Sequence, residues 1–348
     1  MVRRVLVTGG LGFIGSHVVD ELVATSYDVV VLDNLHPGAH RSEPARRDDV
    51  EYHVADVTDA NAVAAALEGV DAVSHQAAMV GLGVDFADAP GYATSNDLGT
   101  AVLLAALHHT GFSGPIALAS SMVVYGEGRY RCARHAVVPA GPRPVDRLEA
   151  GDYDPRCPHC GDALVAEPVP EDAPTDPRNV YAATKLHQEH LCGAYALEHP
   201  EVDVATLRYH NVYGPRMPRD TPYAGVASIF RSAYEGGRAP RVLEDGGQLR
   251  DFVHVTDVAR ANRIALESGR SGVWNVATGT PHTVWDLASA LHRAFAGAPA
   301  PEVVGGWRAG DVRHVFASAD KARTELGFSA TVPFDAGMHD FARAPLRP

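Results

Sequence analysis

Val5-Leu6-Val7-Thr8-Gly9-Gly10-Leu11-Gly12-Phe13-Ile14-Gly15 is the stretch of sequence that decides the fold. The β-branched run before Gly9 is typical of a short buried parallel strand, and the residues from Ser16 to Ala24 are typical of a helix. Glycines between a strand and a helix permit a tight turn and let backbone N–H groups approach a pyrophosphate. The spacing G-x2-G-x2-G is a variant of the usual dinucleotide pattern. The stretch therefore predicts a dinucleotide-binding strand, turn and helix.

The next strand indicates which dinucleotide is bound. Residues 28–32 are apolar after Asp28, and Asp33 follows them, 18 residues after Gly15. An acid at this place binds the 2′-hydroxyl of the adenosine ribose and repels a 2′-phosphate. The sequence therefore predicts NAD rather than NADP.

Strand and helix patterns continue to alternate along the chain. Strands are expected at 51–55, 71–75, 116–119 and 202–207, and helices at 60–67, 97–109 and 179–198. This alternation predicts an α/β fold with a doubly wound parallel sheet, in which ligands bind at the carboxyl ends of the strands. Asp33, Asp56, Ala77 and Ser121 all fall at such ends.

Length and composition define the broad class. A chain of 348 residues predicts about two domains. We expect a Rossmann NAD-binding domain at 1–208, to which 252–267 return, and a smaller C-terminal α/β substrate domain at 209–251 and 268–348. No apolar run reaches the ~20 residues that span a membrane.

A net charge of −13 argues against nucleic-acid binding. The first strand arrives too early for a signal-peptide core, which predicts a cytoplasmic protein.

Tyr181-Ala-Ala-Thr-Lys185 carries the strongest chemical signal. Lys185 is one of two lysines, against 28 arginines. Residues four apart on a helix share a face, so the phenol and the ammonium can occupy one site. A nearby cation lowers a tyrosine pKa from about 10, which would let Tyr181 exchange protons near neutral pH. Taken alone, the pair also fits a surface helix.

Several segments together resemble one enzyme family, the extended short-chain dehydrogenases/reductases, in their nucleotide-sugar epimerase/dehydratase branch. The resemblance covers nearly the whole chain in family order, apart from one insertion. The matching segments are 8–15, 33–34, 56–57, 75–78, Asn96, 120–126, 181–185, 208–216 and 246–255.

The resemblance implies roles for particular residues. Tyr181 corresponds to the catalytic acid/base, Lys185 to the residue that holds the nicotinamide ribose, and Ser121 to the hydroxyl that bonds the sugar. The implied NAD contacts are Gly9, Gly12, Phe13, Ile14, Gly15, Asp33, Asn34, Asp56, Val57, Ala77, Ala78, Asn96, Tyr181 and Lys185. The implied substrate contacts are Ser121, Met122, Asn211, Arg216, Tyr223, Arg250 and Arg308.

Two of these assignments have a plain alternative. Arg250 and Arg308 are expected at the substrate diphosphate, because the planar guanidinium binds phosphate oxygens in pairs. The alternative, in a chain with 43 acidic residues, is surface salt bridges, but the motif positions of the two arginines favour phosphate.

Met122 and Val123 distinguish between the reactions of the branch. Dehydratases of this family carry an acid pair here, and the sugar-acid decarboxylases usually carry a glutamate at the second place. The resemblance therefore implies 4-epimerisation through a 4-keto sugar.

The expected substrate is a dTDP-6-deoxyhexose such as dTDP-L-rhamnose, a UDP-hexose or a UDP-hexuronic acid. The alternatives are an NAD(P)H-dependent 4-ketoreductase and a catalytically retired NAD-binding sensor. Packing of the 97–109 and 179–198 helices into a homodimer is implied by resemblance alone.

Residues 127–178 form an insertion with little periodicity. It contains Cys132-x2-His135 and, after a 21-residue gap, Cys157-x2-Cys160. Two such knuckles supply four ligands for a structural Zn²⁺. The alternatives are a loop with incidental cysteines and a redox pair at Cys157 and Cys160. Because it stands just before Tyr181, we expect the insertion to cover the sugar pocket.

Overall fold

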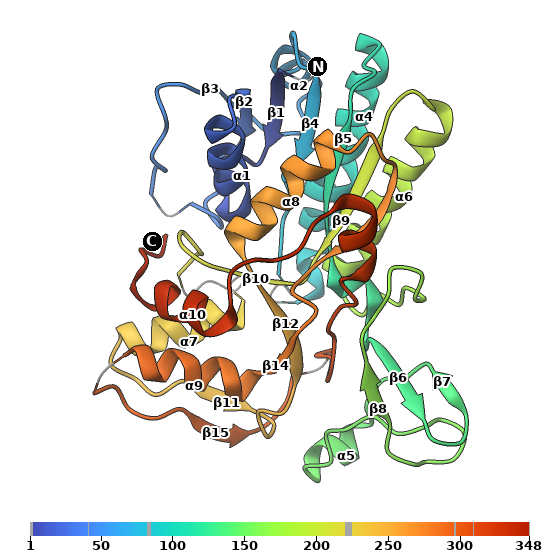
Figure 1. Ribbon diagram of the computed structural model, residues 1–348, viewed down its shortest axis with the longest axis vertical. Coiled ribbons are helices and arrows are strands. Elements are labelled where there is room, and N and C mark those ends of the chain that lie inside the picture. The colour runs from blue at the N-terminus through green and yellow to red at the C-terminus, as the bar shows by residue number, and fades with distance from the viewer. Residues whose placement is uncertain are drawn as a thin grey trace.

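A seven-stranded parallel sheet forms the centre of the computed structural model, which describes residues 3–40, 42–81, 85–219, 225–295, 297–308 and 310–347 (Figure 1). Its strand order is β13-β9-β5-β4-β1-β2-β3. The predicted doubly wound sheet is confirmed. The strands are β1 (Arg4–Thr8), β2 (Asp28–Asp33), β3 (Glu51–Val54), β4 (Ala72–His75), β5 (Ile116–Ser121), β9 (Val204–Tyr209) and β13 (Gly272–Val276).

Helices cover both faces of this sheet. The helices α1 (Phe13–Ala24) and α8 (Val255–Glu267) share a core with Val5 and Val7 of β1. Leu6 points to the other face, where α2 (Ala60–Ala66), α4 (Gly99–Thr110) and α6 (Val180–Glu198) pack. All three β1 residues are fully buried, and each such side chain contributes about 1.5–3 kcal/mol. The shorter α3 (Ala89–Tyr92) and a π-helix (Ala93–Leu98) precede α4.

The crevice for a ligand lies where the strand order reverses, between β1 and β4. The glycine turn after β1 meets the chain after β4 here. A Cβ atom on Gly9 would lie 2.8 Å from the Cα of Ala77, and Gly9 has a φ of +66°. A Cβ atom on Gly15 would lie 2.1 Å from the Gly9 carbonyl oxygen. Only glycine fits at these two positions, which keeps backbone exposed toward the crevice.

A second core lies beneath the carboxyl ends of the strands (Figure 1). It contains a sheet of β10 (Asn211–Tyr213), β12 (Leu249–His254) and β14 (Pro281–Thr283), and a pair of β11 (Arg241–Leu243) and β15 (Glu302–Gly305). The helices α7 (Val226–Glu235), α9 (Val284–Ala294) and α10 (Phe334–Arg343) pack around it. No helix of the described residues has the length and apolar character to cross a membrane.

The strand β13 departs from the expected division, in which 268–348 belonged wholly to the smaller domain. It pairs with β9 in the large sheet, and Trp274 is buried there. The reason is that β9, the chain returning through α8, and β13 complete a parallel crossover on the main sheet.

The insertion is more ordered than its weak periodicity suggested. It forms an antiparallel sheet of β6 (Arg129–Cys132), β7 (Ala136–Val138) and β8 (Val165–Glu167), with a short helix α5 (Val145–Glu149). Tyr130, Val138 and Leu164 form its own small core together with Cys132 and Cys157. In Figure 1 this module projects away from the central sheet beside β12.

Candidate active site

The Tyr181–Lys185 pair is positioned by the start of α6. The Asn179 side chain caps this helix by accepting a hydrogen bond from the Ala182 N–H at 2.9 Å. One turn further, the Lys185 Nζ donates to the Ala119 carbonyl oxygen of β5 at 2.8 Å. Ser121 ends β5, and its hydroxyl is hydrogen-bonded to the Tyr181 phenol. The three expected catalytic residues therefore meet at one point.

Burial dominates the ionisation of this pair. It raises the pKa of Tyr181 to about 12, although the hydrogen bond with Ser121 opposes the shift. It also lowers the pKa of Lys185 to about 7, against an opposing effect of the Glu189 charge. The expected lowering of the Tyr181 pKa by Lys185 is therefore not found. The Lys185 ammonium bonds to a carbonyl, and desolvation outweighs any field that it exerts on the phenol.

One continuous cavity of about 420 Å³ connects the glycine turn with these residues. It runs from the ends of β1 and β2 past Tyr181 to the first residues of β10. Most of the predicted site residues line it. These are Gly9, Gly12, Phe13, Ile14, Gly15, Asp33, Asn34, Asp56, Val57, Ala77, Ala78, Ser121, Met122, Tyr181, Lys185 and Asn211.

Asp33 is held as a carboxylate at the cofactor end of the cavity. Its oxygens accept hydrogen bonds from the N–H groups of Leu11 (3.0 Å) and Leu35 (2.9 Å). His40 lies 3.5 Å away. Burial opposes ionisation, but bonds from His40 and the two amides outweigh it and lower the pKa of Asp33. A negative charge therefore faces the place where a 2′-phosphate would have to enter.

Four of the predicted contact residues that the structure describes do not line the cavity, and two of these are Asn96 and Arg216. Asn96 is fully buried, where its amide bonds both to the Met79 backbone and to the Thr184 hydroxyl. It connects the loop after β4 to α6. Arg216 pairs with Asp20 of α1 at 2.6 Å and contacts His17. Both side chains hold neighbouring segments of the site together, because their polar groups bond to other residues of the protein.

The arginines expected at the diphosphate lie outside the cavity lining. Arg250 donates to the carbonyl oxygens of Leu249, Val312 and Arg313 at 2.7–2.8 Å. Burial raises the pKa of Asp311, whereas the charges of Arg250 and Arg308 lower it, so both arginines approach this carboxyl group. Tyr223 lies outside the described residues.

Arg347 lines the cavity and was not predicted. The terminal segment pairs with the loop before α7, where the Arg347 N–H donates to the Met217 carbonyl oxygen at 3.0 Å. The guanidinium donates to the Gly12 carbonyl oxygen at 3.3 Å. Burial and the charge of Arg216 lower the pKa of Arg347 to about 10. No spacing in the sequence distinguishes this arginine from the others.

The four expected zinc ligands converge in the insertion, with their ligand atoms within 4.8 Å of one another. None of the residues 127–178, all of which are described, lines the cavity. The expectation that the insertion covers this cavity is therefore wrong, because its sheet projects beside β12 instead.

A parallel sheet with a glycine turn, a carboxylate at the end of β2 and a Tyr–Lys pair beside both defines a Rossmann dinucleotide-binding protein of the short-chain dehydrogenase type. The chain belongs to the NAD dependent epimerase/dehydratase family, whose sequence model matches residues 5–144 and 159–277. The unmatched residues between these two parts fall within the insertion.

Characterised relatives are similar over almost the full chain. A dTDP-L-rhamnose 4-epimerase of Burkholderia thailandensis is 34% identical over 97% of this chain and 93% of its own. The UDP-glucose 4-epimerase of Thermus thermophilus, solved in complex with NAD, superposes with a TM-score of 0.78 at 30% identity, covering 98% of both chains. The UDP-N-acetylglucosamine 4-epimerase of Methanobrevibacter ruminantium has a TM-score of 0.79 at 27% identity, covering 98% of this chain and 97% of its own.

Proposed function

We propose that this protein is an NAD-dependent 4-epimerase of a nucleotide-diphosphate sugar. The observation that carries the proposal is the composition of the cavity around Tyr181. The hydroxyls of Tyr181 and Ser121 meet there, and Met122 and Val123, which cannot transfer protons, occupy the neighbouring positions. This set supports reversible oxidation at one carbon and lacks the acid pair that elimination of water needs.

The protein supplies proton transfer and orientation. As the phenolate, Tyr181 takes the proton from the sugar O4 hydroxyl, and the phenol that results returns it after the sugar has turned over, while Ser121 holds that hydroxyl in place. Lys185 would hold the nicotinamide ribose. When bound, NAD⁺ would supply the acceptor and then the donor of a hydride at C4 of the sugar. The Gly9 and Gly15 cradle, in which no Cβ fits, matches the pyrophosphate of this cofactor.

The substrate end of the cavity has an acceptor ready for a ligand. The Asn211 Oδ1 is buried and has no hydrogen-bond partner in the described part of the chain. An unpaired buried acceptor costs about 1–3 kcal/mol, which a hydroxyl or amide donor of the substrate would recover. By resemblance to the family, Arg250 and Arg308 are assigned to the diphosphate, although neither lines the cavity and both approach the Asp311 carboxyl group.

A dTDP-6-deoxyhexose such as dTDP-L-rhamnose is the first substrate to test, with UDP-hexoses and UDP-hexuronic acids next. The relative from Burkholderia thailandensis supports the former and the solved UDP-sugar epimerases support the latter. A 4-ketoreductase would use the same residues but consume reduced cofactor, and a retired sensor would not turn over. The homodimer and the cytoplasmic location stay predictions.

We assign Arg347 to the cofactor pyrophosphate. Its guanidinium lies at the Gly12 carbonyl oxygen, beside the turn that would receive the phosphates. A partly desolvated arginine in this position would pair with the two phosphate charges more strongly than a solvated one.

Purified protein incubated with dTDP-L-rhamnose, UDP-glucose or UDP-glucuronic acid, without added NAD, tests the function. Formation of the C4 isomer is the expected result, because the cofactor is regenerated in each cycle. Turnover that requires added NADPH would indicate a reductase, and no turnover of any sugar would indicate a sensor. A Tyr181→Phe variant should keep its bound NAD and lose about 10²–10⁴-fold in kcat.

A further inference from the structure

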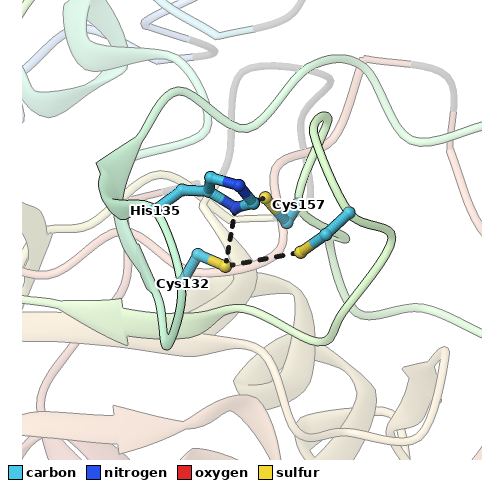
Figure 2. A group of neighbouring side chains, drawn as sticks. Cys132, His135 and Cys157 are labelled. Atoms are coloured by element: carbon cyan, nitrogen blue, oxygen red, sulfur yellow. Dashed lines mark hydrogen bonds between the residues drawn. The ribbon is translucent and has the colours of Figure 1, made fainter.

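Four side chains converge at one end of the insertion (Figure 2). Cys132 and His135 come from the turn between β6 and β7, and Cys157 and Cys160 from the turn that precedes β8. The Cys132 Sγ lies 3.6 Å from the Cys160 Sγ, and the His135 Nδ1 lies 3.5 Å from the Sγ atoms of both Cys132 and Cys157. Tetrahedral Zn²⁺ with Zn–S of about 2.3 Å and Zn–N of about 2.0 Å separates its ligand atoms by about 3.5–3.8 Å. The observed separations match the edges of such a tetrahedron.

We propose that Cys132, His135, Cys157 and Cys160 bind one structural Zn²⁺. Three sulfurs and one imidazole form a soft donor set that favours zinc over calcium, magnesium or manganese. All four positions are supplied by the protein, so the site is closed and has no open position for a reacting group. The insertion is also small, with a core of a few residues, and small modules commonly need a metal to stay folded.

Backbone hydrogen bonds hold the turn that carries Cys157 and Cys160. The Gly161 N–H donates to the Cys157 carbonyl oxygen at 2.9 Å, and the Cys157 N–H donates to the Asp162 carbonyl oxygen at 2.8 Å. Gly161 has a φ of +76°, a conformation that other residues adopt only with strain. Cys132 and Cys157 are buried, while Cys160 is partly exposed.

A redox-active disulfide explains the positions of these four side chains less well than a zinc ion does. The sulfurs of Cys132 and Cys160 are 3.6 Å apart, whereas a disulfide requires about 2.05 Å. This contact joins the two turns and is not the Cys157–Cys160 pair that a C-x2-C redox motif would use. A disulfide would also leave one thiol and the imidazole of His135 without a role.

The site lies at one end of a strand whose other end contacts the smaller domain. Tyr130 is two residues before Cys132 on β6, and its hydroxyl accepts a hydrogen bond from the His314 N–H at 3.1 Å. Glu127, just before β6, accepts one from the Arg313 N–H at 2.6 Å. The Arg313 carbonyl oxygen in turn accepts a hydrogen bond from Arg250. The metal-held module therefore supports the segment that orients Arg250.

This arrangement makes the zinc a positioning element for substrate binding, a step that rests on the proposed role of Arg250 at the diphosphate. Removing the metal should loosen β6 and the Val312–His314 segment. A coupling of about 0.5–2 kcal/mol corresponds to a KM for the nucleotide sugar that rises about 2- to 30-fold. The amount of bound NAD should stay the same, because no insertion residue lines the cavity.

Metal analysis of the full-length protein, purified without an immobilised-metal step, tests the site. One zinc per chain is expected, and Co²⁺ in its place should give thiolate-to-cobalt charge-transfer absorption. Cys157→Ser should lose the metal. His159→Asn is the matched control, since His159 is an exposed residue of the same turn and should keep it. Protein without zinc, or with another metal, or with a Cys132–Cys160 disulfide, would overturn the proposal.

Two outcomes separate this proposal from the proposed function. Zinc bound by all four residues in a protein that epimerises no sugar would leave the metal site standing and the function refuted. An active epimerase without zinc would do the reverse. If Cys157→Ser does not fold, the zinc content and the cobalt spectrum of the wild-type protein still decide. An unchanged KM after chelation of the metal would refute the coupling to Arg250.

Discussion

Lys185→Met should make the cofactor-free protein more stable at neutral pH while abolishing its activity. Burial lowers the pKa of Lys185 from 10.5 to about 7. One pKa unit corresponds to about 1.4 kcal/mol, so the buried ammonium costs the folded state about 4 kcal/mol at pH 7. Methionine removes this cost but also removes the bond to the Ala119 carbonyl oxygen, worth about 1.5–3 kcal/mol. The net gain in the free energy of unfolding is about 1–3 kcal/mol.

The stability difference between the wild-type protein and Lys185→Met should depend on pH in a defined direction. The folded pKa of Lys185 lies below the unfolded one, so between pH 7 and 10.5 the unfolded chain binds the additional proton. The stability of the wild-type protein therefore rises with pH across this window. From pH 7 to pH 9.5 the contribution of Lys185 raises the free energy of unfolding of the wild-type protein by about 3 kcal/mol. The Lys185→Met variant does not show this rise. The advantage of the variant should vanish or reverse at pH 9.5.

Urea unfolding of both proteins at pH 7 and pH 9.5 measures this difference. Lys321→Met is the matched control. Lys321 is the other lysine of the chain and also donates to a carbonyl oxygen, that of Val273, but its side chain is partly exposed. Its replacement measures what the loss of a partly exposed lysine and its carbonyl hydrogen bond does at the two pH values. A Lys185→Met protein whose difference from wild type is equal at pH 7 and pH 9.5 would refute the reasoning.

Three further predictions follow from single contacts. Asn179→Ala removes the cap of α6 and should lower the free energy of unfolding by about 1 kcal/mol; an unchanged thermal midpoint would show that the cap contributes nothing. Arg208→Leu leaves the buried Glu189 carboxylate without the guanidinium that lies 2.7 Å away, and should cost about 3–5 kcal/mol in urea unfolding; a loss below 1 kcal/mol would contradict this. Arg347→Gln should weaken NAD binding, measured by calorimetry on cofactor-free protein, by about 1.5–3 kcal/mol, or roughly 10- to 150-fold; equal affinity would remove Arg347 from the cofactor site.

Features that depend on residues close together in the sequence could be predicted from the sequence. The glycine turn, the strand that ends at Asp33 and the helix that carries Tyr181 and Lys185 each follow from local backbone conformation and side-chain periodicity. The Cys132–His135 and Cys157–Cys160 pairs are local in the same sense, because two residues in one tight turn face the same way. These signals predicted the sheet, and most of the site residues that they and the family resemblance indicated line the cavity.

Tertiary structure alone decided the partners of the long polar side chains and the charge states in the site. Arg216 is drawn to Asp20 of α1, and Arg347 reaches Gly12 from the far end of the chain. The Tyr181 pKa rises because packing excludes water, an effect that the spacing to Lys185 cannot report. The two cysteine turns meet only because β6 pairs with β8. Sequence spacing specifies geometry within one turn of chain, whereas desolvation and long-range pairing depend on segments that only the fold brings together.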